Sequence, residues 1–304
     1  MGDREEEAFF SDPTVEDIVL GTIDRVDGLS ETQQRKLLKR FRKVRQELTD
    51  RLLTVPEGTF TEQQLNVTLV QINAAIAAIK QDLKSGLVDS AEILGIQGVK
   101  DLIREVERFS KKFEGSVQPL NIDPIVVAED SQNFLINKYD ASIDAYSEGL
   151  RAQITQNIVN SLAVRDTSQR TVGRLVSDIG RFFVGEEWKL DRIVRTEMSN
   201  IYNFSKINGM SEIKEEFVPD LKKALLHPMD NRTGDDSKQL ARKNPVVDID
   251  KPFVFTFKRR LKDGTVKEER REFMFPPDRP NDRAILISYR DEWGKKAAGF
   301  TPGE

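Results

Sequence analysis

One long amphipathic pattern, spanning residues 136–162, constrains the fold of this chain more than any other feature. Its apolar residues recur every three or four positions, which is the spacing of one face of an α-helix. They are Ile136, Tyr139, Ile143, Tyr146, Leu150, Ile154, Ile158 and Leu162. The pattern predicts a helix over 126–165 that serves either as a member of a bundle or as a strut holding an N-terminal bundle away from the rest of the chain.

Two capping boxes, at 30–33 and 61–64, precede helical patterns in the N-terminal half. Each is followed by apolar residues at three- and four-residue steps, and Gly86 would end the second helix. A third, shorter helix is predicted over 90–113. Antiparallel pairing of the first two helices would bury their apolar stripes, so we expect a helical hairpin or bundle over 30–125.

The segment before these helices, residues 1–29, is acidic at its start and contains two short apolar pieces. We interpret it as an N-terminal arm. The acidic residues 5–7 and the apolar pair Phe9-Phe10 would suit anchoring to a neighbouring subunit, and the composition fits a disordered tail equally well.

The composition excludes several kinds of site. The 304 residues include no Cys and a single His, His227, so disulfide scaffolds, thiolate metal sites and multi-histidine metal sites are excluded. Charged residues make up 32% of the chain and nearly balance at a net charge of −4, so strong attraction of the whole molecule to nucleic acid is not expected. The acidic start is unlike a signal peptide and no apolar run reaches the length of a membrane span, so we expect a soluble protein made in the cytoplasm.

Motifs for catalysis give no positive support to an enzyme. No phosphate-binding glycine loop, kinase motif set or nucleophile elbow is present. The acidic pair Asp235/Asp236 could hold a metal or act in acid–base chemistry, but its setting, NRTGDDSK, favours the start of a capped helix. We therefore expect no catalytic residues, no metal and no cofactor.

The segment 188–210 has a helical pattern that places a carboxylate, Glu197, among apolar residues. Ile193, Ile201 and Phe204 lie four residues before, four after and seven after Glu197, so all four share one helix face. A buried carboxylate is costly unless it is paired or hydrogen-bonded, and the arginines of the same helix project elsewhere. Glu197 therefore either takes a partner from another segment or lies at the edge of the packed face.

Past Pro219 the pattern changes from helices to strands and turns. Phe253, Phe255 and Phe257 alternate, and a turn at Asp263-Gly264 predicts a β-hairpin over 253–275. A short strand is predicted over 284–287. The hairpin carries the basic residues Lys258, Arg259, Arg260, Lys262, Lys267, Arg270 and Arg271. They form either an ordinary solvated face or a surface for DNA phosphates, for which Lys258, Arg259, Arg260, Lys262 and Arg270 are the candidates.

These patterns together predict a mainly α chain, with an extended N-terminal helical region followed by a small α+β C-terminal domain over 166–304. Within that domain, Asp166-Thr167-Ser168 would cap a helix that Gly185 would end, just before the helix that carries Glu197.

Several short motifs follow one another in this C-terminal part. They are Arg195-Thr196-Glu197, then Asn203, then Asp230-Asn231-Arg232-Thr233, then Pro276-Pro277, and then Arg279-Pro280-Asn281-Asp282-Arg283. Their order, over roughly residues 165–290, resembles the C-terminal domain of Mu F-like phage minor head proteins. Arg279, Asp282 and Gly234 stand where the family has a histidine and two cysteines, so any metal or cysteine cluster of the family is absent from this chain.

The resemblance implies a structural motif made of Arg195, Thr196, Glu197, Asn203, Asp230, Arg232, Thr233, Pro277, Pro280, Asn281 and Arg283. With it comes the expectation that Glu197 accepts a charge-assisted hydrogen bond from Arg232 or Arg283, the family-matched arginines.

The resemblance also implies a function. Such proteins are low-copy virion components that act in head assembly. They lie inside the head near the portal vertex, and their partners are the portal protein or the major capsid protein. Some members are thought to contact or accompany the packaged double-stranded DNA. An oligomer around the portal would fit. Two alternatives remain: a toxin-like or nuclease effector with the same domain type, or a scaffolding-type helper that is lost from finished particles. Because only four residues follow Phe300, we expect no appended enzymatic module.

Overall fold

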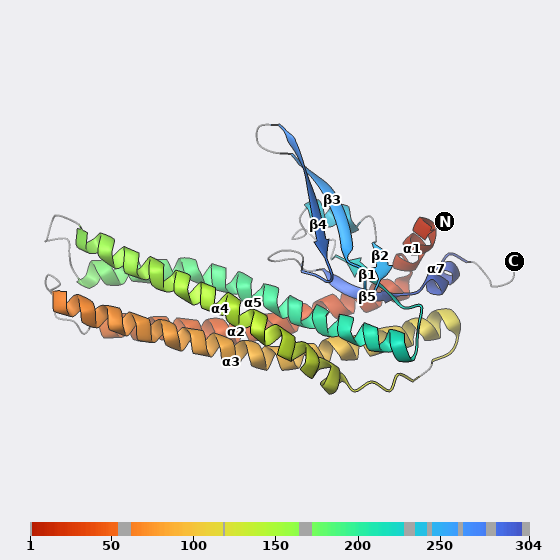
Figure 1. The fold of residues 1–304 in the computed structure, drawn as a ribbon, viewed down its shortest axis with the longest axis horizontal. Coiled ribbons are helices and arrows are strands. Elements are labelled where there is room, and N and C mark those ends of the chain that lie inside the picture. The colour runs from red at the N-terminus through yellow and green to blue at the C-terminus, as the bar shows by residue number, and fades with distance from the viewer. Residues whose placement is uncertain are drawn as a thin grey trace. The chain divides into compact units, whose positions relative to one another are not determined.

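The computed structural model describes most of the chain. The described residues are 2–53, 62–117, 119–163, 172–227, 235–241, 245–260, 264–277 and 284–299. The fold is mainly α, with long helices followed by short antiparallel strands near the C-terminus, which confirms the predicted fold class (Figure 1). Among the described helices, none combines the length and the apolar composition of a membrane span.

Four long helices dominate the structure: α2 (Pro13–Leu53), α3 (Glu62–Phe109), α4 (Pro124–Ala163) and α5 (Val172–Glu216). Each contributes residues to both of two compact units. The first unit consists of Met1–Ser30, Ala91–Asn133 and Arg195–Glu304, and the second of Glu31–Ser90 and Phe134–Val194. The unit boundaries therefore differ from the sequential domains that the sequence suggested, because each long helix continues from one unit into the other.

The second unit is made of helix segments with an apolar interior. The predicted stripes supply much of it, and the buried residues are Leu37 and Phe41 on α2, Ile72, Ile76, Ile79 and Leu83 on α3, Ile143, Leu150 and Ile154 on α4, and Phe183 on α5. Leu190 of α5, which was not predicted, is buried as well. Ion pairs join neighbouring helices, with Lys84 Nζ 3.0 Å from Asp140 and 3.3 Å from Asp144. The long helix over 126–165 is confirmed as α4.

Several predicted helix boundaries are wrong. Ser30 and Gln33 lie inside α2 and are buried, while Gly86 and Gly185 lie inside α3 and α5. A helical glycine costs only about 1 kcal/mol relative to alanine, which burial of the flanking apolar residues outweighs. Beside Gly86, the Ser90 hydroxyl donates to the Gly86 carbonyl oxygen at 2.6 Å. The predicted caps at 61 and 166–168 lie outside the described residues.

The first unit adds strands to the helices. The strands β2 (Val246–Asp248), β1 (Lys222–Leu226) and β5 (Ile285–Tyr289) form one antiparallel sheet in that order. The strands β3 (Phe253–Arg260) and β4 (Val266–Phe273) form the predicted hairpin, which pairs Phe253 with Phe273 and Arg260 with Val266. Two short helices, α6 (Asp235–Ala241) and α7 (Asp291–Ala297), complete the unit.

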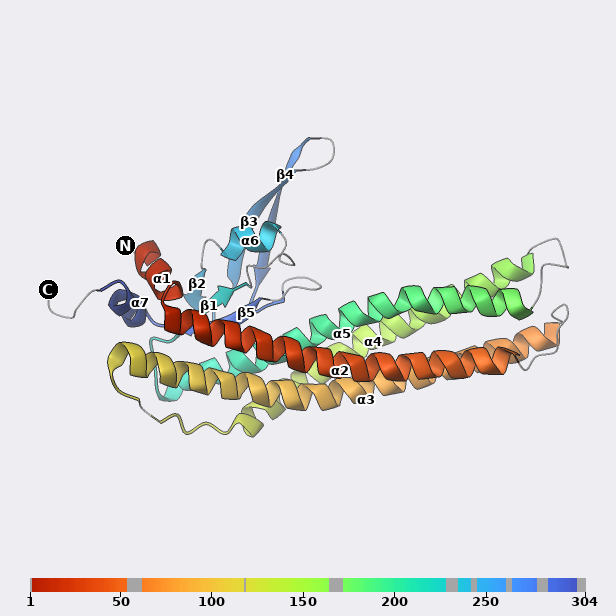
Figure 2. The same cartoon turned by 180° about the vertical axis from the view of Figure 1, so that it is seen from behind.

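The N-terminal segment belongs to this core, so its interpretation as an arm for a neighbouring subunit is wrong. Residues Gly2–Phe10 form helix α1, which packs beside α7 near the C-terminus (Figure 2). Phe9 is completely buried, and its ring contacts those of Phe109, Tyr289 and Trp293 at centroid distances of 5.3, 5.1 and 6.3 Å. In the sequence, an apolar pair that follows an acidic run is typical of a tail. In the structure, Phe9 instead fills an aromatic cluster within the same chain.

Two glycines bring α3 and α5 close together in the first unit. A Cβ atom on Gly98 would lie 2.6 Å from the backbone oxygen of Tyr202, and one on Gly209 would lie 2.9 Å from Leu102. The backbones therefore approach more closely than alanine would allow. This approach places the polar side chains of α3 and α5 within reach of strand β5.

Candidate functional site

The candidate site lies on the part of α5 that carries the resemblance motif. Glu197 is 8% exposed, so the structure buries the carboxylate that the sequence placed on an apolar face. It accepts a hydrogen bond from Asn200 Nδ2 at 2.9 Å. The neighbouring Arg195 and Thr196 are half-buried. The proposed partners of Glu197, Arg232 and Arg283, lie outside the described residues, so that ion pair stays a prediction.

Asn203 joins α5 to strand β5. Its side-chain oxygen accepts the backbone N–H of Leu286 at 2.9 Å, and its Nδ2 donates to the backbone oxygen of Ala284 at 3.3 Å. The same Nδ2 donates to the carbonyl oxygen of Ser199 one turn earlier at 2.9 Å. The amide thus bonds to β5 as a neighbouring strand would, and it is completely buried.

Lys206 and Glu105 continue this contact along β5. Lys206 Nζ donates to Glu105 at 2.6 Å and to the backbone oxygen of Leu286 at 2.6 Å. Glu105 also accepts the Ser288 hydroxyl at 2.6 Å and the Ser288 backbone N–H. The Lys206 and Glu105 side chains are 0% and 2% exposed, and each charge meets both an opposite charge and a backbone or hydroxyl group.

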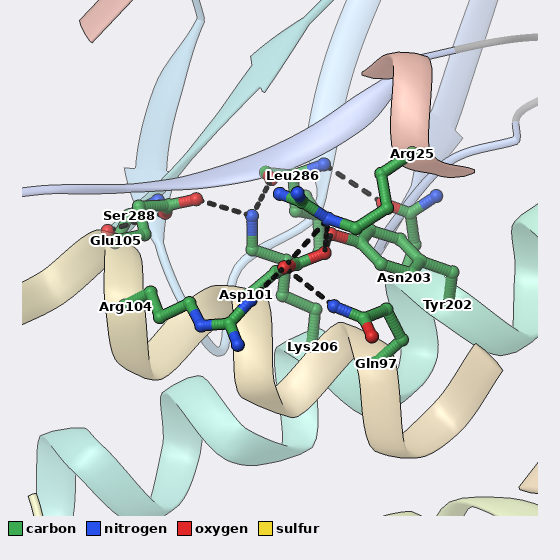
Figure 3. Close-up of polar contacts among 10 residues, drawn as sticks. All are labelled: Arg25, Gln97, Asp101, Arg104, Glu105, Tyr202, Asn203, Lys206, Leu286 and Ser288. Carbon is green, nitrogen blue, oxygen red and sulfur yellow. Dashed lines mark hydrogen bonds and ion pairs between the residues drawn. The ribbon is translucent and has the colours of Figure 1, made fainter. Parts of the chain in front are cut away.

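These contacts close the outer edge of β5. The sheet order leaves β5 at an edge, with β1 on one side only. Leu286 and Ser288 of the strand turn backbone groups toward Asn203, Lys206 and Glu105 (Figure 3). Ala284, which directly precedes the strand, likewise accepts a hydrogen bond from Asn203 through its backbone oxygen. Side chains from two helices therefore replace the missing strand and satisfy backbone groups that would otherwise be costly to bury.

Asp101 forms a second centre one helical turn before Glu105. It accepts hydrogen bonds from Tyr202 Oη at 3.1 Å, Arg25 Nε at 3.2 Å and Gln97 Nε2 at 2.8 Å (Figure 3). Burial, together with the nearby Asp101 and Glu105 carboxylates, raises the pKa of Tyr202 well above its usual value. Tyr202 therefore stays a neutral donor.

A second buried lysine, Lys223 of β1, holds the end of the hairpin. Its Nζ donates to the backbone oxygen of Met274 at 2.7 Å and lies 5.1 Å from the centre of the Phe253 ring. Burial lowers the pKa of Lys223 to about 8. The bonded carbonyl lies three residues before Pro277 of the resemblance motif, and the motif residues Asp230, Arg232, Thr233, Pro280, Asn281 and Arg283 lie outside the described residues.

The hairpin surface is mixed in charge. Lys258 and Arg270 are 72% and 67% exposed, and each lies beside a glutamate, Glu268 at 3.3 Å and Glu272 at 3.4 Å. These four side chains sum to no net charge. The side chains of Arg259 and Arg260, and all of Lys262, lie outside the described residues, so phosphate contact stays a prediction with little support from the described part of the hairpin.

The sequence interpretation missed most of the buried network: Asp101, Glu105, Tyr202, Lys206, Lys223 and Ser288. A signal for Lys206 was present, since it is the single charged residue in the sequence over 198–211. Asp101 and Glu105 share the spacing of one helix face in KDLIREVERF. The β5 partners of Lys206 and Glu105 could not be paired from the sequence, because they lie 80 and 183 residues away.

The arrangement holds elements together, and its polar atoms already have protein partners. Among the residues that the structure describes, no group of three or more His, Asp or Glu side chains is placed to hold a metal ion.

Comparison with protein-family models, with curated proteins and with solved structures finds no significant match to this chain.

Proposed function

We propose that this chain is a structural minor head protein of a tailed phage, acting in head assembly in association with the portal or the inner capsid. The observation that carries the proposal is the contact of Asn203 with β5. Asn203 follows Arg195-Thr196-Glu197 on α5, and Ala284 directly follows the Arg279–Arg283 segment. Asn203, a residue of the first motif, thus contacts the strand that begins just after the second motif in the sequence, which supports reading the two motifs as parts of one domain.

A structural role also accords with how the buried ionisable groups are used. Glu105 and Lys206 bond to each other and to backbone groups of β5, and Asp101 accepts hydrogen bonds from the side chains of Arg25, Gln97 and Tyr202. Catalytic groups are more often placed in a cleft with their reactive atoms available to a substrate. Contact with packaged DNA through the hairpin is a weaker part of the proposal, because Lys258 and Arg270 on its solvent face lie beside glutamates.

The test is mass spectrometry of purified virions from the phage that encodes this chain, with copy number calibrated to the portal. We expect a low copy number in finished particles and co-purification with portal or capsid protein. Presence in immature heads but absence from finished virions would favour the transient assembly helper. Cleavage of DNA by the purified chain would favour the nuclease effector.

Contact with DNA is tested in the full chain, because deleting residues 1–125 would remove the buried residues Phe9, Asp101 and Glu105 from the first unit. The variant reverses the charge of Arg259 and Arg260. If DNA retention is unchanged by this variant across a salt series, the hairpin does not contact phosphates.

A further inference from the structure

A long stretch of α3 in the second unit carries no charged side chain. From Gln63 to Ile79 the sequence is QQLNVTLVQINAAIAAI, within a chain of which 32% of residues are charged. A helix at the surface of a protein normally carries charged residues on the side that faces water, and a helix without them is normally covered on all sides.

Among the α3 residues from Val67 to Val88 whose side chains the structure describes, one side is buried and the opposite side is exposed. Ile72, Ile76, Ile79 and Leu83 are buried within the second unit. On the opposite side the exposed residues are Val67, Val70, Ala74, Ala77, Ala78, Gln81, Ser85 and Val88, which we call the α3 stripe. Val67 and Val70 are 50% and 67% exposed. The α3 stripe is thus an uncharged helix face in contact with water.

The α3 stripe has the geometry of a helix-pairing seam. Val67, Val70, Ala74, Ala78, Gln81, Ser85 and Val88 follow one another at steps of three or four residues, as the residues of one continuous helix face do, and Lys84 lies beside this face. Small side chains at its centre allow a second helix to approach closely. From Val67 to Val88 the stripe is about 32 Å long and about 10 Å wide, from the rise and diameter of an α-helix.

The charges at its borders favour a second copy of the same helix as the occupant. Lys80 and Lys84 lie on one flank, where they also pair with α4, and Asp82 and Asp89 lie on the other. In a parallel, in-register pair, the lysine flank of each helix lies against the aspartate flank of the other. An antiparallel pair would instead bring lysines to lysines. Nucleic acid would require cations, of which the α3 stripe has none.

We propose that the α3 stripe is a homotypic interface, through which α3 of one copy packs in parallel and in register against α3 of a second copy. In a symmetric dimer the same surface of each copy faces its counterpart, so like charges at the centre would repel each other. The centre of the α3 stripe carries no charged residue. The footprint is less than half of the roughly 800 Å² per partner that a standard interface buries, so the dimer is weak and forms in a concentration-dependent way. The inference does not depend on the proposed function.

The first test is sedimentation of the purified full chain over a wide concentration range. We expect a monomer–dimer equilibrium that Ala77→Glu weakens by at least about tenfold, because two glutamates then face each other across the pair. Ala152→Glu is the matched control, since Ala152 is also exposed on a helix of the second unit, and it should dimerise like the wild type. A wild-type chain that stays monomeric up to millimolar concentration, or equal weakening by both variants, would overturn the proposal.

The second test uses the absence of native cysteine, which leaves a single introduced thiol able to pair only with its counterpart in another copy. Val67→Cys, Ala74→Cys, Gln81→Cys and Val88→Cys, each made alone, should all form disulfide-linked dimers under mild oxidation. Lys36→Cys, at an exposed position on α2, is the control. Cross-linking at one central position alone would indicate antiparallel pairing and overturn the arrangement, and yields no higher than the control would overturn the interface.

Discussion

The two compact units use their charged side chains in different ways. In the first unit, the Lys206 and Glu105 side chains are 0% and 2% exposed and hold strand β5. In the second unit, ion pairs such as Lys84 with Asp140 lie at partly exposed helix borders, with side chains 24% and 48% exposed around an apolar interior. The cost of breaking a buried pair far exceeds that of breaking a solvated one, so removing one partner of an ion pair should destabilise the first unit more than the second.

The two tryptophans allow the units to be followed separately. Trp293 is buried in the first unit, and Trp188 is 61% exposed in the second. A Trp188→Phe background therefore leaves Trp293 as the sole reporter of the first unit, without changing a buried residue. Variants of the first unit are therefore compared in the Trp188→Phe background.

The largest effect is expected from Lys206→Met. Removing the cation leaves Glu105 buried without its opposite charge, and the free energy of unfolding of the first unit should fall by about 3–5 kcal/mol. Urea unfolding followed by Trp293 fluorescence measures this. The double variant Lys206→Met/Glu105→Leu is the control and should cost less than the single change, because no charge is stranded. A cost below about 1 kcal/mol for the single variant would contradict the buried-pair account.

Asn203→Ala is expected to rank second. It strands the N–H of Leu286 and the carbonyl of Ala284, and each unsatisfied buried group costs about 1–3 kcal/mol. Amide hydrogen exchange of Leu286, together with urea unfolding, measures the loss. Asn203→Asp keeps an acceptor for Leu286 but no donor for Ala284, so its effect on Leu286 exchange should be smaller. Equal exchange rates in the two variants would mean that Asn203 does not close the strand edge.

Much of the fold was predictable because apolar periodicity reports directly which helix faces are buried. Among the described stripe residues, Leu37 of α2, Ile72 of α3 and Ile143 of α4 lie in the interior, as do the alternating phenylalanines of β3. The helix ends were not predictable. Ser30, Gly86 and Gly185 carry local stop or start signals worth about 1 kcal/mol each, and packing along a continuous helix outweighs them.

The candidate site was predictable only in part, for a related reason. Glu197 stood out because a carboxylate on an apolar face violates a local rule. Groups of β5 offset the cost of burying the charges of Lys206 and Glu105. Nothing in the local sequence marks Ser288 as the donor to Glu105 or the Leu286 carbonyl oxygen as the acceptor from Lys206. The interpretation of Phe9 as part of an arm was wrong for the same reason. Phe109 and Tyr289, which bury its ring, lie 100 and 280 residues away in the sequence.

The same substitution should have opposite signs in the two units. Gly98→Ala places a Cβ 2.6 Å from the backbone oxygen of Tyr202, and forcing α3 and α5 apart should cost about 1–3 kcal/mol. Gly149→Ala, on α4 in the second unit, meets nothing within 4 Å and should stabilise by about 0.5–1 kcal/mol. Thermal unfolding of each variant measures both. A neutral Gly98→Ala would mean that the helices of the first unit are not in such close contact.

Lys223 should give the first unit a pH dependence in the alkaline range. Its pKa is lowered from 10.5 to about 8 by burial, so between these values the unfolded chain binds a proton that the folded chain releases. The free energy of unfolding therefore rises with pH across this range, by at most about 1.4 kcal/mol per pH unit. Lys223→Met removes this contribution, so the difference between the wild type and the variant should grow from pH 8 to pH 10. A difference that is constant with pH would contradict the lowered pKa.

The smallest effect is expected at an ion pair of the second unit. Glu187 accepts hydrogen bonds from Arg45 at 2.7 Å and Arg42 at 3.0 Å, and the Arg42 side chain is 57% exposed. Because water screens this contact, Glu187→Gln should lower the free energy of unfolding by about 0.3–1 kcal/mol, and less in 1 M salt, where the Debye length is about 3 Å. Hydrogen exchange of the α2 and α5 amides measures this loss of stability.

Glu105→Gln is the matched change in the first unit. Its larger cost should not vary with salt, because no solvent reaches the buried Glu105–Lys206 pair. If the two substitutions showed the same cost and the same salt dependence, the units would not differ in how they use charge.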